Sequence, residues 1–432
     1  MKSHAKALEF LYGLQRHGIR LGLEATGAML DHLGRPDRRF VALHVAGTNG
    51  KGATAAMAAA VLHAAGLRVG LYTSPHLMDF RERIRVGGVP ISEERVVELV
   101  ERVLTTVRGD QTPTFFEFTT VMAFLHFADA EVDVAVCEVG MGGRFDATNV
   151  LVPAVTAITN VSLDHEAFLG STVAAIAGEK AGIIKTGIPV ITGRLSAEAE
   201  EVIATVSAER SAVRYRLDRD FRCEGNPLTG FEYHGLERRL GGLTCPLPGA
   251  HQLDNAACAL AMVEVLSRRG ISVSDEAVRS GLHSVSWEGR LECVEQQPML
   301  LLDGAHNPAA AKALALYLHD LRRDMPDARI ILVTGMMRDK DRTGFFRLLL
   351  PLVDEVVLTQ AGLSRAATVQ EMRQALPHWP LPVHEETVPS AAVAAARRSA
   401  RPQDIILVTG SLILVGEVKA LLLGCELSPL RG

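Results

Sequence analysis

The chain has 432 residues, of which 48% are hydrophobic and 22% charged, and its formal net charge is −5. This length exceeds what one hydrophobic core usually serves, so it predicts two domains. The acidic balance argues against a general nucleic-acid or membrane-surface binder, so any anionic ligand must be held by local Lys, Arg or backbone N–H groups. The six cysteines form no CxxC pair and no zinc spacing, and the sequence shows neither a signal peptide nor an apolar stretch long enough to span a bilayer. We therefore expect a cytoplasmic protein.

Short β-rich runs alternate with helical segments along most of the chain. In the first part we expect strands at residues 40–45, 132–139 and 154–159, and helices at residues 53–65 and 172–181. An irregular, charged stretch at 210–239 follows, and strands resume at 299–302, 329–334, 355–359 and 404–409. This alternation predicts an α/β protein with mainly parallel sheets, whose ligands collect beyond the carboxyl ends of the strands. We place the domains at residues 1–296 and 297–432.

A glycine-rich segment, GTNGKG at residues 47–52, lies between the first expected strand and its helix. Such a turn aims backbone N–H groups and a helix N-terminus at phosphates, and Lys51 adds a point charge. The strict phosphate-loop pattern fails, because Val45 stands where its first Gly belongs and Gly52 where Ser or Thr belongs. The missing hydroxyl is the group that normally holds Mg²⁺. The segment by itself indicates either nucleotide binding or an ordinary glycine-rich turn.

Four further polar residues follow strands or lie on helices. Ser74, in TSPHL, offers the oxygen that Gly52 lacks, although a Ser-Pro pair is usually only a turn. Glu138 ends a buried strand, where a carboxylate is costly unless it binds a cation or forms a buried ion pair. His165, in LDHE, is a single histidine of the kind that is more often structural than a ligand. Lys180, in EKAG, taken alone is best explained as a solvated helix charge.

The order of these motifs is more specific than any one of them. The strings GTNGKG, TSPHL, FRERI, FFEFTT, EVGMGGRFDATN, LDHEAFLG and EKAGIIK come first, and LPGAHQLDNA, WEGR, LDGAHNP, GMMRDKD and VTGSLILVGEV follow. Together they closely resemble the folylpolyglutamate synthase/dihydrofolate synthase family of the Mur-ligase-like group, over nearly the whole chain. The resemblance implies an N-terminal phosphate-loop-type ATPase domain, a smaller Rossmann-like C-terminal glutamate-ligase domain, and an active site between them.

The resemblance also implies a reaction. ATP phosphorylates a substrate carboxylate, the amine of L-glutamate attacks the acyl phosphate, and ADP and phosphate leave. Our first interpretation is a bifunctional enzyme that adds glutamate to dihydropteroate and then to reduced folates. The alternatives are a folylpolyglutamate synthase without the first activity, a peptidoglycan-type amino-acid ligase, and a non-catalytic nucleotide-binding regulator. We expect a monomer.

The resemblance assigns roles residue by residue. The expected ATP contacts are Gly47, Thr48, Asn49, Gly50, Lys51, Gly52, Ala53, Gln252, Asn255, Arg290, Asp303 and His306. The expected ligands of two Mg²⁺ ions are Ser74, Glu138, His165 and Lys180, the last as a carbamate. Lys51, His165 and Lys180 are the expected catalytic residues. Residues 115–118 (FFEF) form either a ring-stacking wall for the pterin or ordinary core packing. Ala53 departs from the family pattern, in which Ser or Thr is usual.

Overall fold

A computed structural model describes residues 3–18, 20, 22–107, 112–378 and 380–428. They form two compact units: unit 1 comprises residues 1–76, 80–246 and 252–286, and unit 2 comprises residues 77–79, 247–251 and 287–432. The sequence placed the division later, at 296/297. Residues 292–296 form β12 (Glu292–Gln296), which pairs antiparallel with β13 (Met299–Leu302) and so belongs to the sheet of unit 2. Along the described residues, no helix combines the length and apolarity needed to cross a membrane.

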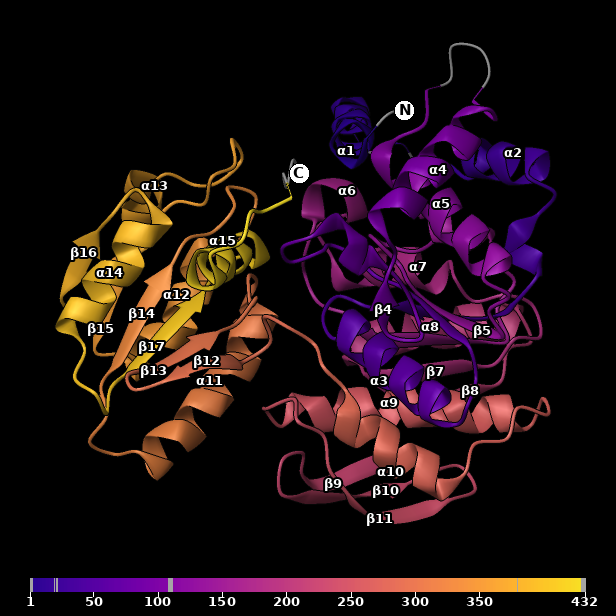
Figure 1. The fold of residues 1–432 in the computed structure, drawn as a ribbon. Helices are drawn as coiled ribbons and strands as arrows, with labels where there is room; N and C mark the ends of the chain where they lie inside the picture. The colour runs from indigo at the N-terminus through magenta and orange to yellow at the C-terminus, as the bar shows by residue number, and fades with distance from the viewer. Residues whose placement is uncertain (1–2, 19, 21, 108–111, 379, 429–432) are drawn as a thin grey trace. The chain divides into compact units, whose positions relative to one another are not determined.

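Unit 1 is built on an eight-stranded sheet in the order β4-β3-β2-β5-β1-β6-β7-β8 (Figure 1). The six strands from β2 to β8 in this order run parallel, and β3 and β4 add an antiparallel edge. Buried parallel strands need continuous apolar runs, which is why the sequence predicted β1, β5 and β6. The strands are β1 Val41–Ala46, β2 Val69–Tyr72, β3 Ile84–Val86, β4 Val89–Pro90, β5 Val134–Glu138, β6 Val155–Asn160, β7 Val190–Arg194 and β8 Arg214–Arg216.

Helices cover both faces of this sheet (Figure 1). Helices α1, α2, α4 and α5 bury one core against Ala42 and Cys137, and α7 and α8 bury another against Ala46 and Ile158. Helix α3 packs against the opposite face, where α10 contacts it. The helices are α1 His4–Gly13, α2 Glu24–His32, α3 Lys51–Ala64, α4 Glu93–Leu104, α5 Phe115–Asp129, α6 Glu166–Leu169, α7 Val173–Ala181, α8 Ala197–Glu209, α9 His251–Ser267 and α10 Asp275–Ser284.

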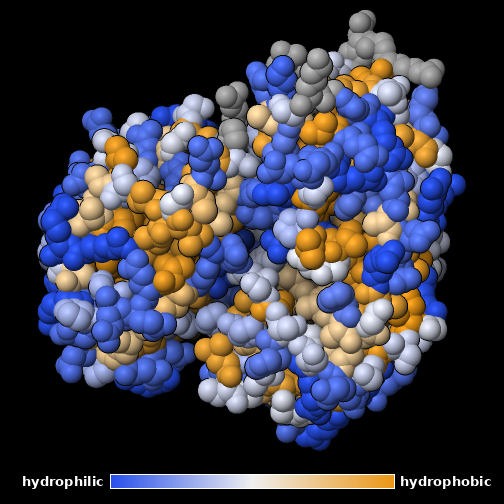
Figure 2. Space-filling view, viewed as in Figure 1, coloured by the Kyte–Doolittle hydropathy of each residue, from blue (hydrophilic) through white to orange (hydrophobic). Residues whose placement is uncertain are grey.

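The irregular stretch at 210–239 contributes to a small antiparallel sheet. Its strands are β9 (Arg222–Asn226), β10 (Gly230–His234) and β11 (Arg239–Leu243), in the order β11-β10-β9. The buried carboxylate of Glu264, on α9, accepts the Tyr233 hydroxyl at 2.8 Å and so ties this sheet to α9. On the face shown in Figure 2, hydrophilic residues cover most of the surface and apolar residues occur in small groups.

Unit 2 is a second α/β layer structure. Its six-stranded sheet has the order β12-β13-β17-β14-β15-β16, and all neighbours except β12 and β13 are parallel. The remaining strands are β14 Ile330–Thr334, β15 Glu355–Leu358, β16 Val383–Glu385 and β17 Ile405–Thr409. The helices are α11 Pro308–Asp324, α12 Arg342–Leu349, α13 Val369–Ala375, α14 Pro389–Ser399 and α15 Leu412–Leu423. The predicted α/β class is confirmed.

Candidate active site

The glycine-rich segment forms the turn between β1, which ends at Ala46, and α3, which begins at Lys51. Gly47 has φ 151° and Gly50 has φ 80°, conformations that residues with a side chain rarely adopt. A Cβ on Gly47 would lie 1.9 Å from the Thr159 hydroxyl, and one on Gly50 would lie 2.3 Å from Asn255 Oδ1. Because the glycines have no side chains, the backbone N–H groups at the helix N-terminus are not covered by side-chain atoms. This is the arrangement that suits a phosphate group.

The end of β6 holds this turn in place. The backbone N–H of Asn49 donates to Asn160 Oδ1 at 2.9 Å, and Asn160 Nδ2 donates back to the Asn49 carbonyl at 2.9 Å. The Thr159 hydroxyl donates to the same carbonyl at 2.6 Å. Sequence reasoning missed Thr159 and Asn160. Their position at the carboxyl end of a predicted strand is the signal that would have found them.

Two lysines point their amines at carbonyls of the turn. Lys51 Nζ donates to the Thr48 carbonyl at 3.2 Å, and Lys180 Nζ donates to the Gly47 carbonyl at 3.0 Å. Lys180 is only 3% exposed, so its interpretation as a solvated helix charge is wrong. Burial, reinforced by the positive charge of Lys51, lowers the pKa of Lys180 to about 7, while Asp164 and Asp146 act in the opposite direction.

Glu138 and Ser74 meet at the same edge of the sheet. Glu138 ends β5 and is buried, and its Oε2 accepts the backbone N–H of Ser74 at 3.0 Å. Strand β5 lies between β1 and β2, and Ser74 follows the end of β2. The glycine-rich turn, Glu138 and Ser74 therefore all lie at the carboxyl ends of three adjacent parallel strands, the edge where the sequence predicted that ligands collect.

His165 caps the short helix α6 in a left-handed conformation, with φ 53°. Its backbone N–H donates to Asp164 Oδ1 at 2.9 Å, and its ring Nε2 lies 4.0 Å from Asp164 Oδ2. Asp164 is a buried carboxylate to which the sequence analysis gave no role. Its electrostatic effect on Lys180 marks it as a neighbour of the proposed site.

The predicted metal ligands supply few carboxylates and imidazoles. Within the described ranges, no three His, Cys, Asp or Glu side chains gather into a metal-binding group. The predicted set contains only Glu138 and His165 of these types, together with the Ser74 hydroxyl and Lys180. These residue types fit Mg²⁺ only if Lys180 carries oxygen donors, because its ammonium form would repel the ion. The metal site therefore stays a prediction.

Asn255 links the glycine-rich turn to α9. Its Nδ2 donates to Gln252 Oε1 at 2.8 Å, and its Oδ1 accepts the Thr54 hydroxyl at 3.5 Å. Both amide residues are buried. The structure thus brings Asn255 beside Gly50, whereas a role of Gln252 or Asn255 in adenine binding stays a prediction.

The remaining predicted residues lie together within unit 2. Asp303 accepts the backbone N–H groups of Leu291 and Ala305 at 3.0 and 2.9 Å. His306 Nδ1 contacts the Gly304 carbonyl at 2.8 Å, and Arg290 Nη1 donates to the Gly289 carbonyl at 3.0 Å. The backbone N–H of Gly304 donates to that same carbonyl at 2.9 Å, which ties the WEGR and DGAHN segments to each other.

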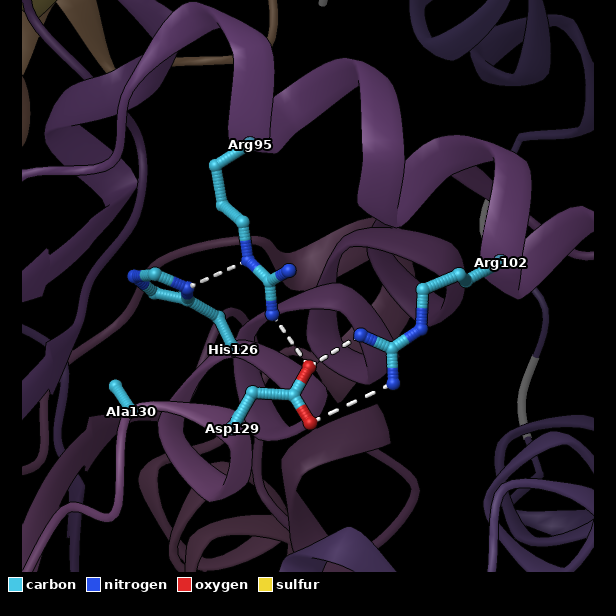
Figure 3. A pocket seen from close by; sticks show the side chains of 5 residues that line it. All are labelled: Arg95, Arg102, His126, Asp129 and Ala130. Carbon is cyan, nitrogen blue, oxygen red and sulfur yellow. Dashed lines mark hydrogen bonds and ion pairs between the residues drawn. The ribbon is translucent and has the colours of Figure 1, made fainter.

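A surface pocket lies apart from these residues, on α4 and α5 (Figure 3). Arg95, Arg102, His126, Asp129 and Ala130 line it. Both guanidinium groups donate to the Asp129 carboxylate, and Arg95 Nε also donates to His126 Nδ1 at 3.4 Å. Because Asp129 already pairs with both arginines, the pocket is an ion-pair network and not a vacant anion site.

Comparisons with known proteins place both units in one class. The model of the Mur ligase middle domain matches residues 45–263, and that of the Mur ligase glutamate ligase domain matches residues 289–412. The fold and the turn beside Lys51 therefore belong to a Mur-type ligase. The chain is 36% identical over 429 residues to the dihydrofolate synthase/folylpolyglutamate synthase of Bacillus subtilis (strain 168), and the match covers 96% of this chain and 98% of that protein. The chain belongs to the folylpolyglutamate synthase/dihydrofolate synthase family.

Solved structures agree with this assignment. The structure of E. coli FolC in complex with DHPP and ADP has a TM-score of 0.89 and 33% identity, and covers 98% of each chain. The bifunctional folylpolyglutamate synthase/dihydrofolate synthase with Mn, AMPPNP and L-glutamate bound has a TM-score of 0.86 and 36% identity, also over 98% of each chain. The predicted family and the two-domain α/β class are confirmed.

Proposed function

We propose that this chain ligates L-glutamate to dihydropteroate and to reduced folates, consuming ATP and forming ADP through an acyl phosphate. The observation that carries the proposal is the pair of amines, from Lys51 and Lys180, directed at a bare glycine turn at the N-terminus of α3. Support comes from the Bacillus subtilis relative, whose name gives both activities, and from relatives solved with DHPP and ADP and with AMPPNP and L-glutamate.

The chemistry requires concentrated positive charge. A carboxylate resists attack by an amine until one of its oxygens becomes part of a phosphate leaving group. During phosphoryl transfer the protein mainly positions the reactants and offsets negative charge. Lys51 and the N–H groups at the start of α3 offer that charge where β1 ends, and their partly buried setting strengthens it. Lys51 is therefore our first catalytic residue.

Ser74, Glu138, His165 and Lys180 would hold two Mg²⁺ ions. When bound, such ions neutralise phosphate oxygens and orient them for in-line displacement. Lys180 fits this set as a carbamate: its neutral amine takes up CO₂ and releases one proton, and the side chain then ends in a carbamate anion with two oxygen donors of the kind Mg²⁺ prefers. The lowered pKa of Lys180 supports this assignment, because only the neutral amine reacts.

The residues that we propose to contact the nucleoside and to complete the nucleotide site are Gln252, Asn255, Arg290, Asp303 and His306. Gln252 and Asn255 begin α9, and Asn255 lies beside Gly50 of the turn. Asp303 and His306 follow β13 in unit 2, at the carboxyl end of a parallel strand, where ligands of α/β sheets bind. We further propose that the chain acts as a monomer.

One comparison tests the proposal. Purified protein is given ATP, Mg²⁺ and L-glutamate with either dihydropteroate or tetrahydrofolate, and ADP and glutamylated product are both measured. We expect ADP and product to form in equal amounts with each acceptor. Elongation of tetrahydrofolate without any reaction of dihydropteroate would favour the monofunctional alternative. Absence of acceptor-dependent ADP with both would contradict the proposal and leave the peptidoglycan-type ligase and the non-catalytic regulator as the alternatives.

A further inference from the structure

Arg83 is a buried arginine without a carboxylate partner. It ends the 3₁₀ helix Phe80–Arg83, just before β3, and is 7% exposed. Its Nε donates to His76 Nδ1 at 2.7 Å, and its guanidinium carbon lies 5.2 Å from the centroid of the Phe115 ring. Over the described residues, no carboxylate lies within ion-pair distance of Arg83. In contrast, the partly buried Arg35 forms an ion pair with Asp37, and the partly buried Arg329 forms one with Asp404.

His76 adds a second donor to this pair. A guanidinium N–H always donates, so His76 Nδ1 must be the acceptor, and the proton of the neutral ring must be on Nε2. His76 is 3% exposed, and its Nε2 is buried with no hydrogen-bond partner in the part of the chain that the structure describes. A buried donor left unsatisfied costs about 1–3 kcal/mol, and a buried unpaired charge costs more. Such groups in a folded protein require an explanation, and a bound ligand that accepts both hydrogen bonds would provide one.

The pair lies beside the proposed phosphate edge. His76 is two residues from Ser74, whose backbone N–H donates to Glu138. Phe115, under the guanidinium, is the first residue of α5 and stacks on Tyr12 with a centroid separation of 5.8 Å. A group bound by Arg83 and His76 would therefore belong to a molecule whose reacting end reaches the carboxyl edge of β2 and β5.

We propose that Arg83 and His76 bind the α-carboxylate at the end of a reduced folate, the carboxylate that is not activated. This inference rests on the proposed function and deepens it. The Arg83 guanidinium and His76 Nε2 offer only donors to a ligand, and a guanidinium matches a carboxylate with two parallel hydrogen bonds. In a terminal glutamate the α-carboxylate is a short carbon chain away from the reacting γ-carboxylate. Dihydropteroate has no second carboxylate, so the pair would determine specificity for elongation and not for the first ligation.

The test combines a protein change with a substrate change. Wild-type protein and Arg83→Gln are each given tetrahydrofolate, dihydropteroate, and a tetrahydrofolate analogue whose glutamate is replaced by γ-aminobutyrate. The analogue keeps the reacting carboxylate and lacks the α-carboxylate. For tetrahydrofolate we expect Arg83→Gln to lower kcat/KM at least about tenfold, the effect of one charge-assisted contact. For the other two acceptors we expect changes below about threefold, because the lost contact does not exist there.

Two controls keep the outcome interpretable. Arg95→Gln removes an arginine that is already paired with Asp129, and should change none of the three values. Arg83→Lys keeps the charge but loses the two-point contact, so it should recover part of the tetrahydrofolate activity. If Arg83→Gln does not fold, as thermal unfolding will show, the wild-type preference for tetrahydrofolate over the analogue and the Arg83→Lys result still test the inference.

Other results would overturn it. An equal loss with all three acceptors would assign Arg83 to a shared group such as the pterin ring, or to folding. A rise confined to the KM for L-glutamate would assign it to the incoming amino acid. Unchanged kinetics in Arg83→Gln would exclude a role of Arg83 in substrate binding. Failure of the wild-type protein to act on any acceptor would instead contradict the proposed function.

Discussion

Lys180 should react with CO₂ at neutral pH. Burial and the charge of Lys51 lower its pKa to about 7, against 10.5 for an ordinary lysine. At pH 8 about 90% of the Lys180 amine is then neutral, compared with roughly 0.3% of an ordinary lysine. The reactive form is therefore about 300-fold more abundant, which favours a carbamate at this position over one on any exposed lysine.

The assay is ¹³C NMR of the protein equilibrated with ¹³C-labelled CO₂ between pH 6 and pH 9. We expect a carbamate resonance that grows through a midpoint near pH 7. Lys180→Arg should lack the resonance and activity, since a guanidinium keeps its charge and forms no stable carbamate. Lys180→Ala should also be inactive, and short carboxylates should restore part of its activity. A resonance that shows no midpoint between pH 6 and pH 9, as expected of an ordinary lysine, or a fully active Lys180→Arg, would refute the reasoning.

The same pKa has a consequence for stability, with a definite sign. Because the folded pKa of Lys180 is depressed, the unfolded chain binds more protons between about pH 7 and 10.5. Without CO₂ or ligands, this group should make the free energy of unfolding rise with pH across that window. Lys180→Met should lose that rise, as chemical denaturation at several pH values will show.

Further substitutions test the turn. Lys51→Ala should lower kcat at least about tenfold at saturating ATP, which is about 1.4 kcal/mol of lost transition-state stabilisation, and a smaller loss would exclude Lys51 as a catalytic phosphate contact. It should also raise the pKa of Lys180, by removing a nearby positive charge, in the NMR titration above. Gly50→Ala should weaken nucleotide binding in calorimetry, because its Cβ would meet Asn255. Gly88→Ala has a similar φ, 81°, and open space around it, so nucleotide binding as tight as wild type is expected there.

The sequence predicted the framework of the site because strongly apolar strands and glycine turns have local causes. β1, β5 and β6 are short, buried runs rich in apolar residues, and the turn before Lys51 needs glycines for its φ angles and for the approach of Thr159. Placing Ser74 and Glu138 at one edge followed from the parallel order of the strands. That reasoning depends on strand direction alone, which the alternating pattern determines.

Tertiary contacts account for what the sequence did not reveal. Lys180 follows a helix pattern shared by solvated lysines, and only packing against the turn shows that it is buried. Asn160 and Thr159 form hydrogen bonds across more than a hundred residues of sequence; the end of a strand marks them as candidates, but only the fold shows that they hold the turn before Lys51. Arg83 lies in a charged run, FRERIR, that is typical of an exposed face, yet it is buried with its guanidinium over the Phe115 ring.

The most direct test of the proposed ligation follows an oxygen atom. Dihydropteroate and tetrahydrofolate, each labelled with ¹⁸O in the reacting carboxylate, are incubated with the protein, ATP and L-glutamate, and the products are analysed by mass spectrometry. The acyl-phosphate route predicts one ¹⁸O atom in the released phosphate for each glutamylated product, with ADP as the nucleotide product. Unlabelled phosphate, or AMP in place of ADP, would contradict it.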